Sequence, residues 1–421
     1  MSTEIAPLLL SPKNGGSKGV DLCYHLPSTG RERGLYDAIV IGAGPVGSYV
    51  AGELAHRGHK VAVLEQHAAI GKKGCCTGIV GRECLERFPV AKQAVAREAK
   101  GARFFSPSGA SFTLQKDAAQ AYILDRQIFD EAMASNARTQ GAEYLLDTKV
   151  QNIVTTGDTA RVQAEARGET SLFEGKVVVV ASGFGSGLPD LLGFGRFGDF
   201  VMGAQAEVDT EVEEVEVYLG SRFSPGFFAW LVPTHQGRAL AGLLARRDNR
   251  AYMETFLRHL RDQGKIASHR VPFRFGGIPL NLLRHTCSNR VIVVGDAAGQ
   301  VKPTTGGGIY YGLLCAGTAV DVLDRAMAGD DFSARTLSEY EKRWKKLLGR
   351  ELRIGRWARR AFERLSDRRM ERLFRMVQDS GATESLLSAP DFSFDWHSRL
   401  ILRALRRFGP RAAVSLLWPP R

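Results

Sequence analysis

The fold of this chain is decided by residues 36–65, which read YDAIVIGAGPVGSYVAGELAHRGHKVAVLE. The apolar run at Asp37–Ile41 predicts a buried strand, the apolar spacing over Val46–Arg57 predicts a helix, and Val61–Glu65 predicts a second strand. A strand, a glycine turn, a helix and a strand in this order form the first unit of a doubly wound α/β sheet. This stretch therefore predicts a nucleotide-binding domain.

The turn between the first strand and the helix carries the pattern G-x-G-x-x-G, at Gly42, Gly44 and Gly47. Glycines lack side chains, so the backbone can approach a pyrophosphate closely, and the N-terminus of the following helix favours the negative charge of that group. Ala43 and Pro45 belong to the same turn and are expected to contact the same group. We therefore predict that a dinucleotide cofactor binds here.

Glu65 ends the second strand, eighteen residues after Gly47. A carboxylate at this point can accept hydrogen bonds from both ribose hydroxyls of an adenosine. The same carboxylate disfavours a 2′-phosphate, because the two negative charges repel each other. The cofactor is therefore expected to be FAD or NAD and not NADP.

A second glycine-rich segment narrows the choice of cofactor. It follows a predicted strand and reads GDAAGQVKPTTGGG at 295–308. Asp296 can direct its carboxylate at a flavin ribityl chain, because it comes directly after the strand. Gly306, Gly307 and Gly308 are expected to begin a helix whose amides face the pyrimidine edge of the flavin. An NAD dehydrogenase has no use for such a segment, so the sequence favours non-covalent FAD.

The remaining pattern predicts an α/β fold with several parts. A Rossmann-like FAD-binding domain, doubly wound with a mainly parallel sheet, is expected to be discontinuous and to comprise residues 36–75, 117–200 and 285–330. Alternation of apolar and polar residues predicts an antiparallel-sheet domain that covers the substrate, made of residues 76–116 and 201–284. Residues 1–35 are interpreted as a flexible leader, and residues 331–421 as a C-terminal basic helical region.

Individual elements are predicted by the same patterns. A helix is expected at Arg126–Thr139, and helical pattern after Gly329 continues to the end with breaks near Gly381 and Pro390. The expected strands are Glu143–Leu146, Thr159–Ala166, Lys176–Ala181, Glu214–Leu219, Ala239–Leu244 and Arg290–Val294.

Composition bounds the location and the classes of site. No apolar run reaches the roughly 18 residues of a membrane-spanning helix, and the first residues do not resemble a signal peptide, so a cytoplasmic protein is expected. The six cysteines lack paired CxxC spacing, which argues against a zinc site, and no metal is expected. Most of the net charge of +12 comes from residues 325–421, which contain 22 Lys plus Arg and 12 Asp plus Glu.

In the two glycine-rich segments and in three segments between them, the chain resembles the geranylgeranyl reductase family, which belongs to the para-hydroxybenzoate hydroxylase-like FAD proteins. The resemblance covers about Tyr36 to Asp324. The segments that carry it are Gly42–Glu65, GKKGCCTG at 71–78, LDRQIFD at 124–130, Pro225–Pro233 and Gly295–Gly312. It implies an FAD enzyme that reduces C=C bonds of an isoprenoid chain.

The resemblance also implies roles for two residues near the flavin. Cys76 lies in the segment that matches the family's Cys-Gly-x-Gly stretch, with Thr77 in place of the glycine. Cys76 is the candidate catalytic residue, where contact with the flavin is favoured over acid catalysis; a thiol that only fills space is the alternative. Arg126 is expected to reach the FAD phosphate region, or else to lie on the helix surface. Val150 is also included among the expected cofactor contacts.

One short segment distinguishes isoprenoid reductases from other flavoenzymes of similar sequence. Residues 228–233, FAWLVP, match the family's Tyr-x-Trp-x-Phe-Pro with Phe228 in place of Tyr and Val232 in place of Phe. Phe228, Trp230 and Pro233 are the expected substrate contacts. Phe228 and Trp230 share one face of a strand, and aromatic faces can stabilise the positive charge that develops when an isolated alkene accepts hydride. Ordinary packing of aromatic side chains in a core is the alternative.

The basic C-terminal region suggests an anionic partner. Arg399, Arg403, Arg406 and Arg407 form one helical face, while Ile401, Leu405 and Phe408 form another and an apolar tail follows at Ala412–Trp418. A similar stripe consists of Ile354, Trp357, Ala361 and Leu365 among arginines. This pattern is typical of a helix at a membrane interface, although packing against the body would give the same stripes. A nucleic-acid role has no accompanying motif.

The sequence therefore predicts an FAD-dependent oxidoreductase that reduces C=C bonds of a prenyl chain on a lipid, quinone or diphosphate, peripherally bound to the inner face of the membrane. Its reductant is left open between NAD(P)H and a ferredoxin-like electron-carrier protein, because no second dinucleotide motif is present. Two alternatives remain: a flavin-dependent monooxygenase or halogenase, and a membrane-associated electron-transfer flavoprotein without a product of its own.

Overall fold

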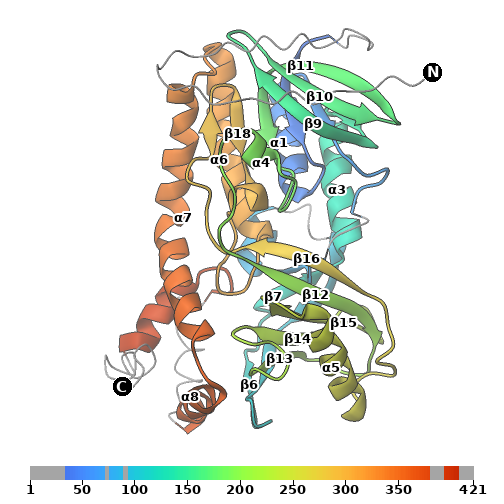
Figure 1. Cartoon of the computed structure of the whole chain (residues 1–421), viewed down its shortest axis with the longest axis vertical. Helices are drawn as coiled ribbons and strands as arrows, with labels where there is room; N and C mark the ends of the chain where they lie inside the picture. The colour runs from blue at the N-terminus through green and yellow to red at the C-terminus, as the bar shows by residue number, and fades with distance from the viewer. Residues whose placement is uncertain (1–33, 72–74, 89–92, 380–392, 407–421) are drawn as a thin grey trace, which may run out of the picture.

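The computed structural model describes residues 34–71, 75–88, 93–379 and 393–406 and confirms the predicted α/β fold (Figure 1). An upper part built on a mainly parallel sheet lies above a lower part built on a mainly antiparallel sheet, and a long helix runs along one side of both. Most of the predicted leader, residues 1–33, lies outside the described residues. The domain boundaries predicted above remain predictions.

The upper sheet has eight strands, six of which lie in the order β17-β18-β11-β1-β2-β8. The neighbours β18, β11, β1, β2 and β8 pair in parallel, as a doubly wound sheet requires. The last two strands, β9 and β10, continue from β11 as an antiparallel ribbon. The strand bounds are β1 (Tyr36–Ile41), β2 (Val61–Leu64), β8 (Glu143–Leu145), β9 (Thr148–Thr155), β10 (Ala160–Ala166), β11 (Glu169–Val180), β17 (Cys287–Ser288) and β18 (Val291–Val293).

Both faces of this sheet are covered, which explains its unbroken apolar strands. On β1, Ala38 and Val40 pack in one cluster with helices α1, α3 and α6, while Ile39 and Ile41 pack in a second cluster with β9 and β10. A strand that is buried on both faces has no polar side to alternate with. The helix bounds are α1 (Pro45–His56), α3 (Arg126–Thr139) and α6 (Ile309–Ala328), with the short helices η2 (Gly295–Ala298) and α4 (Leu188–Leu191) beside them.

The lower sheet has seven strands in the order β16-β12-β15-β14-β13-β5-β6. Its neighbours pair antiparallel, as predicted, except that β13 and β5 pair in parallel. The bounds are β5 (Gly101–Phe105), β6 (Ser111–Gln115), β12 (Phe200–Asp209), β13 (Val215–Leu219), β14 (Phe228–Pro233), β15 (Arg238–Ala245) and β16 (Phe273–Pro279). In a small third sheet, β7 (Ala121–Leu124) lies between β3 (Ile79–Gly81) and β4 (Val95–Ala99). Helix α2 (Arg82–Arg87) follows β3 along the chain. This sheet includes strands from both sides of the predicted domain boundary at 116/117.

Helix α5 (Asn249–Asp262) was not predicted, although it lies within the region interpreted as sheet. Its Met253, Phe256 and Leu257, together with Leu260, are buried against the lower sheet at helical spacing. The helix was missed because the strands on either side alternate apolar and polar residues, and the whole region was interpreted as sheet. The face of the sheet that α5 covers is therefore not the face available to a ligand.

The C-terminal region is helical where the structure describes it. Helix α7 (Ala334–Glu363) runs along the side of the molecule, α8 (Asp367–Asp379) follows at its lower end, and residues 397–406 form a further helix near that end (Figure 1). Buried residues on α7 include Tyr340, Trp344 and Leu352, whereas Trp357 of the predicted apolar stripe is 43% exposed. The predicted breaks at Gly381 and Pro390, together with Arg407, Phe408 and Ala412–Trp418, lie outside the described residues.

Candidate functional site

One cavity of about 950 Å³ lies between the two sheets. One side, which we call the cofactor wall, consists mainly of turns that follow strands of the upper sheet. It includes Gly42, Ala43, Gly44, Pro45, Glu65, Arg126, Asp296, Lys302, Gly306, Gly307 and Gly308. The other side, the substrate wall, is mostly apolar. It includes Phe104, Val215, Val217, Phe228, Trp230, Val232, Leu244, Ile278, Ala358, Arg359, Phe362, Phe394 and Ile401.

The three glycines of the first turn have different physical reasons to be glycine. Gly42 has a φ of +105°, and a Cβ there would lie 2.5 Å from the Ala181 carbonyl oxygen. A Cβ on Gly47 would lie 2.0 Å from the Gly42 carbonyl oxygen, so Gly47 lets α1 pack closely on its own turn. Around Gly44 no atom lies within 4 Å of the Cβ position, although Gly44 lines the cavity. The space beside Gly44 is therefore left for a ligand.

Glu65 is already connected to that turn. Its Oε2 accepts a hydrogen bond from the Ala43 amide at 2.9 Å, and its Oε1 accepts one from the His67 amide at 2.9 Å. The His67 ring contacts the same Oε1. Each carboxylate oxygen has further lone pairs, so Glu65 is held in place with capacity left for the hydroxyls of a ribose.

Asp296 and the glycines after it form the other end of the cofactor wall. A Cβ on Gly308 would lie 2.3 Å from Asp296 Oδ1, so the carboxylate is seated directly against the start of α6. Burial raises the pKa of Asp296 to about 6, although the nearby Arg126 guanidinium lowers it in part. This partly exposed carboxylate accepts no hydrogen bond from the described residues, so it is suited to accept one from a ligand hydroxyl.

Arg126, the first residue of α3, lines the cavity, as Asp296 and Cys76 do. Its Nε and Nη2 donate to the two oxygens of Asp130, at 3.1 and 2.9 Å. Burial alone would lower the pKa of Arg126, but the charge of the Asp130 carboxylate raises it above its ordinary value. Cys76 lines the cavity, and its sulfur accepts from the Gly78 amide at 3.4 Å.

The substrate wall contains the predicted aromatic pair. Phe228 and Trp230 lie on the cavity side of β14, with ring centroids 5.9 Å apart, as the two-residue repeat predicts. A Cβ on Gly242 of the neighbouring β15 would lie 2.4 Å from the Trp230 ring, so this glycine lets the indole lie flat across the sheet. The intervening Ala229 and Leu231 are buried on the opposite face, in the cluster with α5.

Three predicted site residues do not line the cavity. Gly47 acts through packing, as its contact with Gly42 shows. Pro233 follows the alternation of β14 and falls on the side of Ala229 and Leu231. Val150, on β9, packs against the cluster on the far face of the upper sheet.

The sequence-based interpretation missed the part of the cavity that the C-terminal region builds. Arg359 of α7 is one of the arginines around the predicted apolar stripe and was given no role, but it is 6% exposed and lines the cavity. Its guanidinium lies over the Phe227 ring at 3.5 Å and donates to the Gly226 carbonyl oxygen at 2.7 Å. Burial lowers the pKa of Arg359 to about 10, and the Glu363 carboxylate offsets part of that effect.

Ile401 belongs to the C-terminal stripe for which a membrane interface and packing against the body were both considered. It lines the cavity, as Phe394 does, which agrees with packing for this residue. No sequence signal placed residues 393–401 at the cavity, since they follow the nearest cofactor motif by almost one hundred residues. Among the described residues, no cluster of His, Cys, Asp and Glu could hold a metal ion, and no helix is both long and apolar enough to cross a membrane.

Comparison with known proteins shows to which family this chain belongs. Residues 35–343 match the family described as "FAD binding domain". A digeranylgeranylglycerophospholipid reductase of Methanocaldococcus jannaschii is 32% identical over 82% of this chain and 91% of its own length. The corresponding reductase of Methanothrix thermoacetophila is 28% identical over 91% of this chain and 98% of its own.

This chain belongs to the digeranylgeranylglycerophospholipid reductase family. It is an FAD-dependent oxidoreductase, as predicted. The fit to FAD is visible in the open space beside Gly44, in the spare lone pairs of Glu65 and in the Asp296 carboxylate, which lines the cavity and accepts no hydrogen bond from the described residues. Glu65 would hold the adenosine ribose, and Asp296 the ribityl chain.

Solved structures support the same fold. A geranylgeranyl bacteriochlorophyll reductase-like protein of Thermoplasma acidophilum superposes with a TM-score of 0.80 at 23% identity, over 91% of this chain and 98% of that one. A p-nitrophenol 4-monooxygenase of Pseudomonas putida superposes with a TM-score of 0.67 at 16% identity, over 89% and 97%. At such identities the likeness concerns the fold alone, so resemblance to a monooxygenase does not extend to its activity.

Proposed function

We propose that this member of the family reduces the C=C bonds of geranylgeranyl chains on a glycerophospholipid. The observation that carries the proposal is the single cavity in which the FAD contacts and an apolar, aromatic wall face each other. A prenyl chain on that wall would present its double bonds to the flavin without leaving an apolar environment. The names of the most similar relatives supply the headgroup class.

In such an enzyme, bound FAD in its reduced form supplies a hydride to one carbon of the double bond, and the other carbon receives a proton. An isolated alkene is a weak hydride acceptor, so positive charge develops at carbon as the reaction proceeds. The rings of Phe228 and Trp230 lie on the wall where the chain would bind, and their faces can stabilise that charge. The surrounding apolar side chains exclude water, which strengthens this interaction.

Cys76 is proposed as the residue at the junction of cofactor and alkene. It lines the cavity, its sulfur accepts from the Gly78 amide at 3.4 Å, and its carbonyl oxygen accepts from Gln205 of the lower sheet at 3.3 Å. Its expected role is contact with the flavin. The proton is expected to come from water or a nearby group.

The function is tested with the FAD-loaded protein, reduced anaerobically by dithionite and mixed with vesicles containing digeranylgeranylglycerophospholipid. We expect reoxidation of FAD and a lipid mass gain of two units per double bond, while the fully saturated lipid in matched vesicles causes neither. A lipid that gains the mass of oxygen, with consumption of O₂ in air, would instead identify a monooxygenase. FAD that no prenyl lipid reoxidises would favour the electron-transfer flavoprotein. Parallel reduction with NADH, NADPH and reduced ferredoxin identifies the electron donor.

We further propose that the enzyme binds anionic membranes at the lower end of α7 and at α8. Trp357 is 43% and Met376 39% exposed there, and both are surrounded by arginines. The exposed arginines of this surface are Arg353, Arg360, Arg364, Arg368, Arg372 and Arg375. A basic surface with exposed apolar side chains fits an anionic lipid interface, to which each cation adds about 1 kcal/mol.

Vesicle sedimentation tests this surface. Replacing Arg360 and Arg364 by Glu should release the protein from vesicles rich in phosphatidylglycerol, and salt should weaken binding of the unaltered protein. Glu substitutions at the exposed Arg247 and Arg258, beside and on α5, are the matched control because they change charge on another part of the molecule. Equal pelleting of all three proteins would contradict the proposal. Deletion after Pro390 is unsuitable, since it also removes Ile401 from the cavity.

A further inference from the structure

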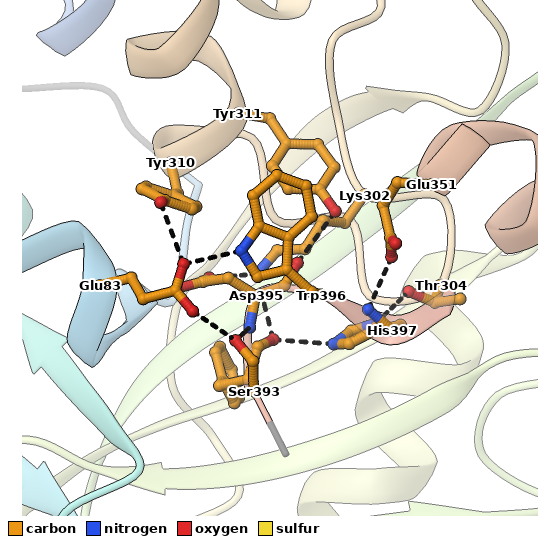
Figure 2. Close-up of polar contacts among 11 residues, drawn as sticks. Glu83, Lys302, Thr304, Tyr310, Tyr311, Glu351, Ser393, Asp395, Trp396 and His397 are labelled. Carbon is orange, nitrogen blue, oxygen red and sulfur yellow. Dashed lines mark hydrogen bonds and ion pairs between the residues drawn. The ribbon is translucent and has the colours of Figure 1, made fainter. Parts of the chain in front are cut away.

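A short C-terminal segment, residues 393–398, is inserted under the flavin loop and is fixed by polar contacts (Figure 2). Glu83 accepts from Ser393 Oγ at 3.1 Å and from Trp396 Nε1 at 2.7 Å. Glu351 of α7 accepts from the backbone amides of His397 and Ser398, at 2.6 and 2.9 Å. Contacts to two separate helices therefore hold this segment at one position.

At the centre of the segment lies a buried ion pair. Lys302 Nζ is 2.8 Å from Asp395 Oδ1, and the side chains are 5% and 1% exposed. The Tyr311 hydroxyl donates to the Asp395 backbone carbonyl at 2.9 Å, but Asp395 Oδ2 has no hydrogen-bond partner among the described residues. A buried charge depends strongly on its partner, so Lys302 is the main stabilising contact of this carboxylate.

Lys302 is also part of the loop that carries the flavin glycines. Its amide donates to the Gly307 carbonyl oxygen at 3.0 Å, and its own carbonyl oxygen accepts from the Gly306 amide at 2.8 Å. Its side chain passes beneath the loop, because a Cβ on Gly307 would lie 2.8 Å from Lys302 Cε and 3.5 Å from Nζ. Lys302 lines the cavity next to these glycines.

We propose that the Lys302–Asp395 ion pair sets the reduction potential of the bound FAD, with Asp395 as the positioning residue that holds the lysine and offsets part of its charge. FAD gains negative charge at its pyrimidine edge on reduction, and the glycines at 306–308 are where that edge is expected. A cation beside them stabilises the reduced form, and the carboxylate limits the effect. In a poorly solvated site such charges act strongly over several ångströms.

Another titratable residue of the segment, His397, also contacts this loop. His397 donates or accepts at Thr304 Oγ1 at 2.6 Å, and burial, with the positive charge of Lys302, lowers the pKa of His397 to about 4. His397 is therefore neutral near pH 7. The inference depends on bound FAD and is independent of which lipid is reduced.

The test is the midpoint potential of FAD-loaded variants, measured by dye-coupled redox titration. Asp395→Asn leaves the lysine charge uncompensated and should shift the potential to more positive values, whereas Lys302→Met should shift it to more negative values. The double variant should lie between the two. Glu339→Gln, which removes a partner of Arg343 at 2.7 Å on the exposed side of α7, makes the same charge change far from the loop and should leave the potential unchanged.

Shifts of the same sign in both single variants would overturn the proposal, because a merely structural role loosens the loop in either case. An unchanged potential in Asp395→Asn would also overturn it. If Lys302→Met does not fold, as judged by thermal melting with and without FAD, Asp395→Asn and the double variant decide the matter. The double variant should then have a less positive potential than Asp395→Asn, and equal potentials would contradict a role for the lysine charge.

Discussion

The cofactor wall and the substrate wall of the cavity differ in how their residues are brought together. Most contacts on the cofactor wall lie at turns that follow strands, and their neighbours in sequence define much of their geometry. The substrate wall combines β14, the end of α7 and residues 393–401, which meet only in the folded chain. The difference suggests that single substitutions within a turn can disrupt the cofactor wall, while the shape of the substrate wall depends on packing between distant parts of the chain.

The largest effect is expected for Glu65→Arg. It removes two charge-assisted hydrogen bonds to the ribose, each of about 1.5–3 kcal/mol, so FAD affinity should fall by roughly 10²–10⁴-fold. The ratio of FAD absorbance to protein measures the loss. Glu65→Gln, which keeps the shape and one acceptor oxygen, should retain more cofactor. Full FAD occupancy in Glu65→Arg would refute the ribose assignment.

A matched pair of glycine substitutions tests whether Gly47 serves packing of the turn while Gly44 leaves space for the cofactor. Gly47→Ala should destabilise the apoprotein by about 1–3 kcal/mol, because its Cβ would lie 2.0 Å from a backbone oxygen. Gly44→Ala should leave the apoprotein as stable as before and lower FAD affinity at least about tenfold, a loss of about 1.4 kcal/mol, because its Cβ enters only the ligand space. Chemical denaturation and FAD titration separate the two effects. Similar behaviour of both variants would contradict the assigned roles.

A smaller effect is expected from the pH dependence of apoprotein stability. Because burial raises the folded-state pKa of Asp296 to about 6, the native state binds more protons than the unfolded state between about pH 4 and 6. Its contribution to stability therefore falls as pH rises through this window and is constant above it, with a ceiling of about 3 kcal/mol. Denaturant titrations of the apoprotein from pH 4.5 to 7.5 should show this fall, and Asp296→Asn should remove it.

The smallest effect is expected at the junction of the two walls. Cys76→Ala removes a sulfur that lines the cavity but leaves the contacts of Glu65 and Asp296 intact. FAD should remain bound, while turnover or the number of reduced double bonds changes. Titration with FAD and mass spectrometry of the product lipid measure the two quantities. Unchanged activity would identify Cys76 as a packing residue.

The same comparison explains what the sequence could and could not predict. Helix Arg126–Thr139 was predicted to the residue, since Asp125 caps it through its own side chain, which accepts from the amides of Gln127 and Ile128. The burial of Arg359 could not be predicted, because it depends on Phe227 and Gly226, more than one hundred residues earlier. The ion pair between Lys302 and Asp395 was missed for the same reason. Local capping and turn geometry leave a signal in sequence, whereas contacts between distant elements do not.

The position of Ile401 in the cavity has a consequence for synthesis on the ribosome. Every predicted FAD contact has emerged once Gly308 leaves the exit tunnel, but the wall that includes Phe394 and Ile401 is completed only about 90 residues later. At translation rates of roughly 5–20 residues per second, this leaves an interval of about 5–20 seconds. During that interval the nascent protein presents an open pocket, so cofactor loading can precede the arrival of the segment that closes it.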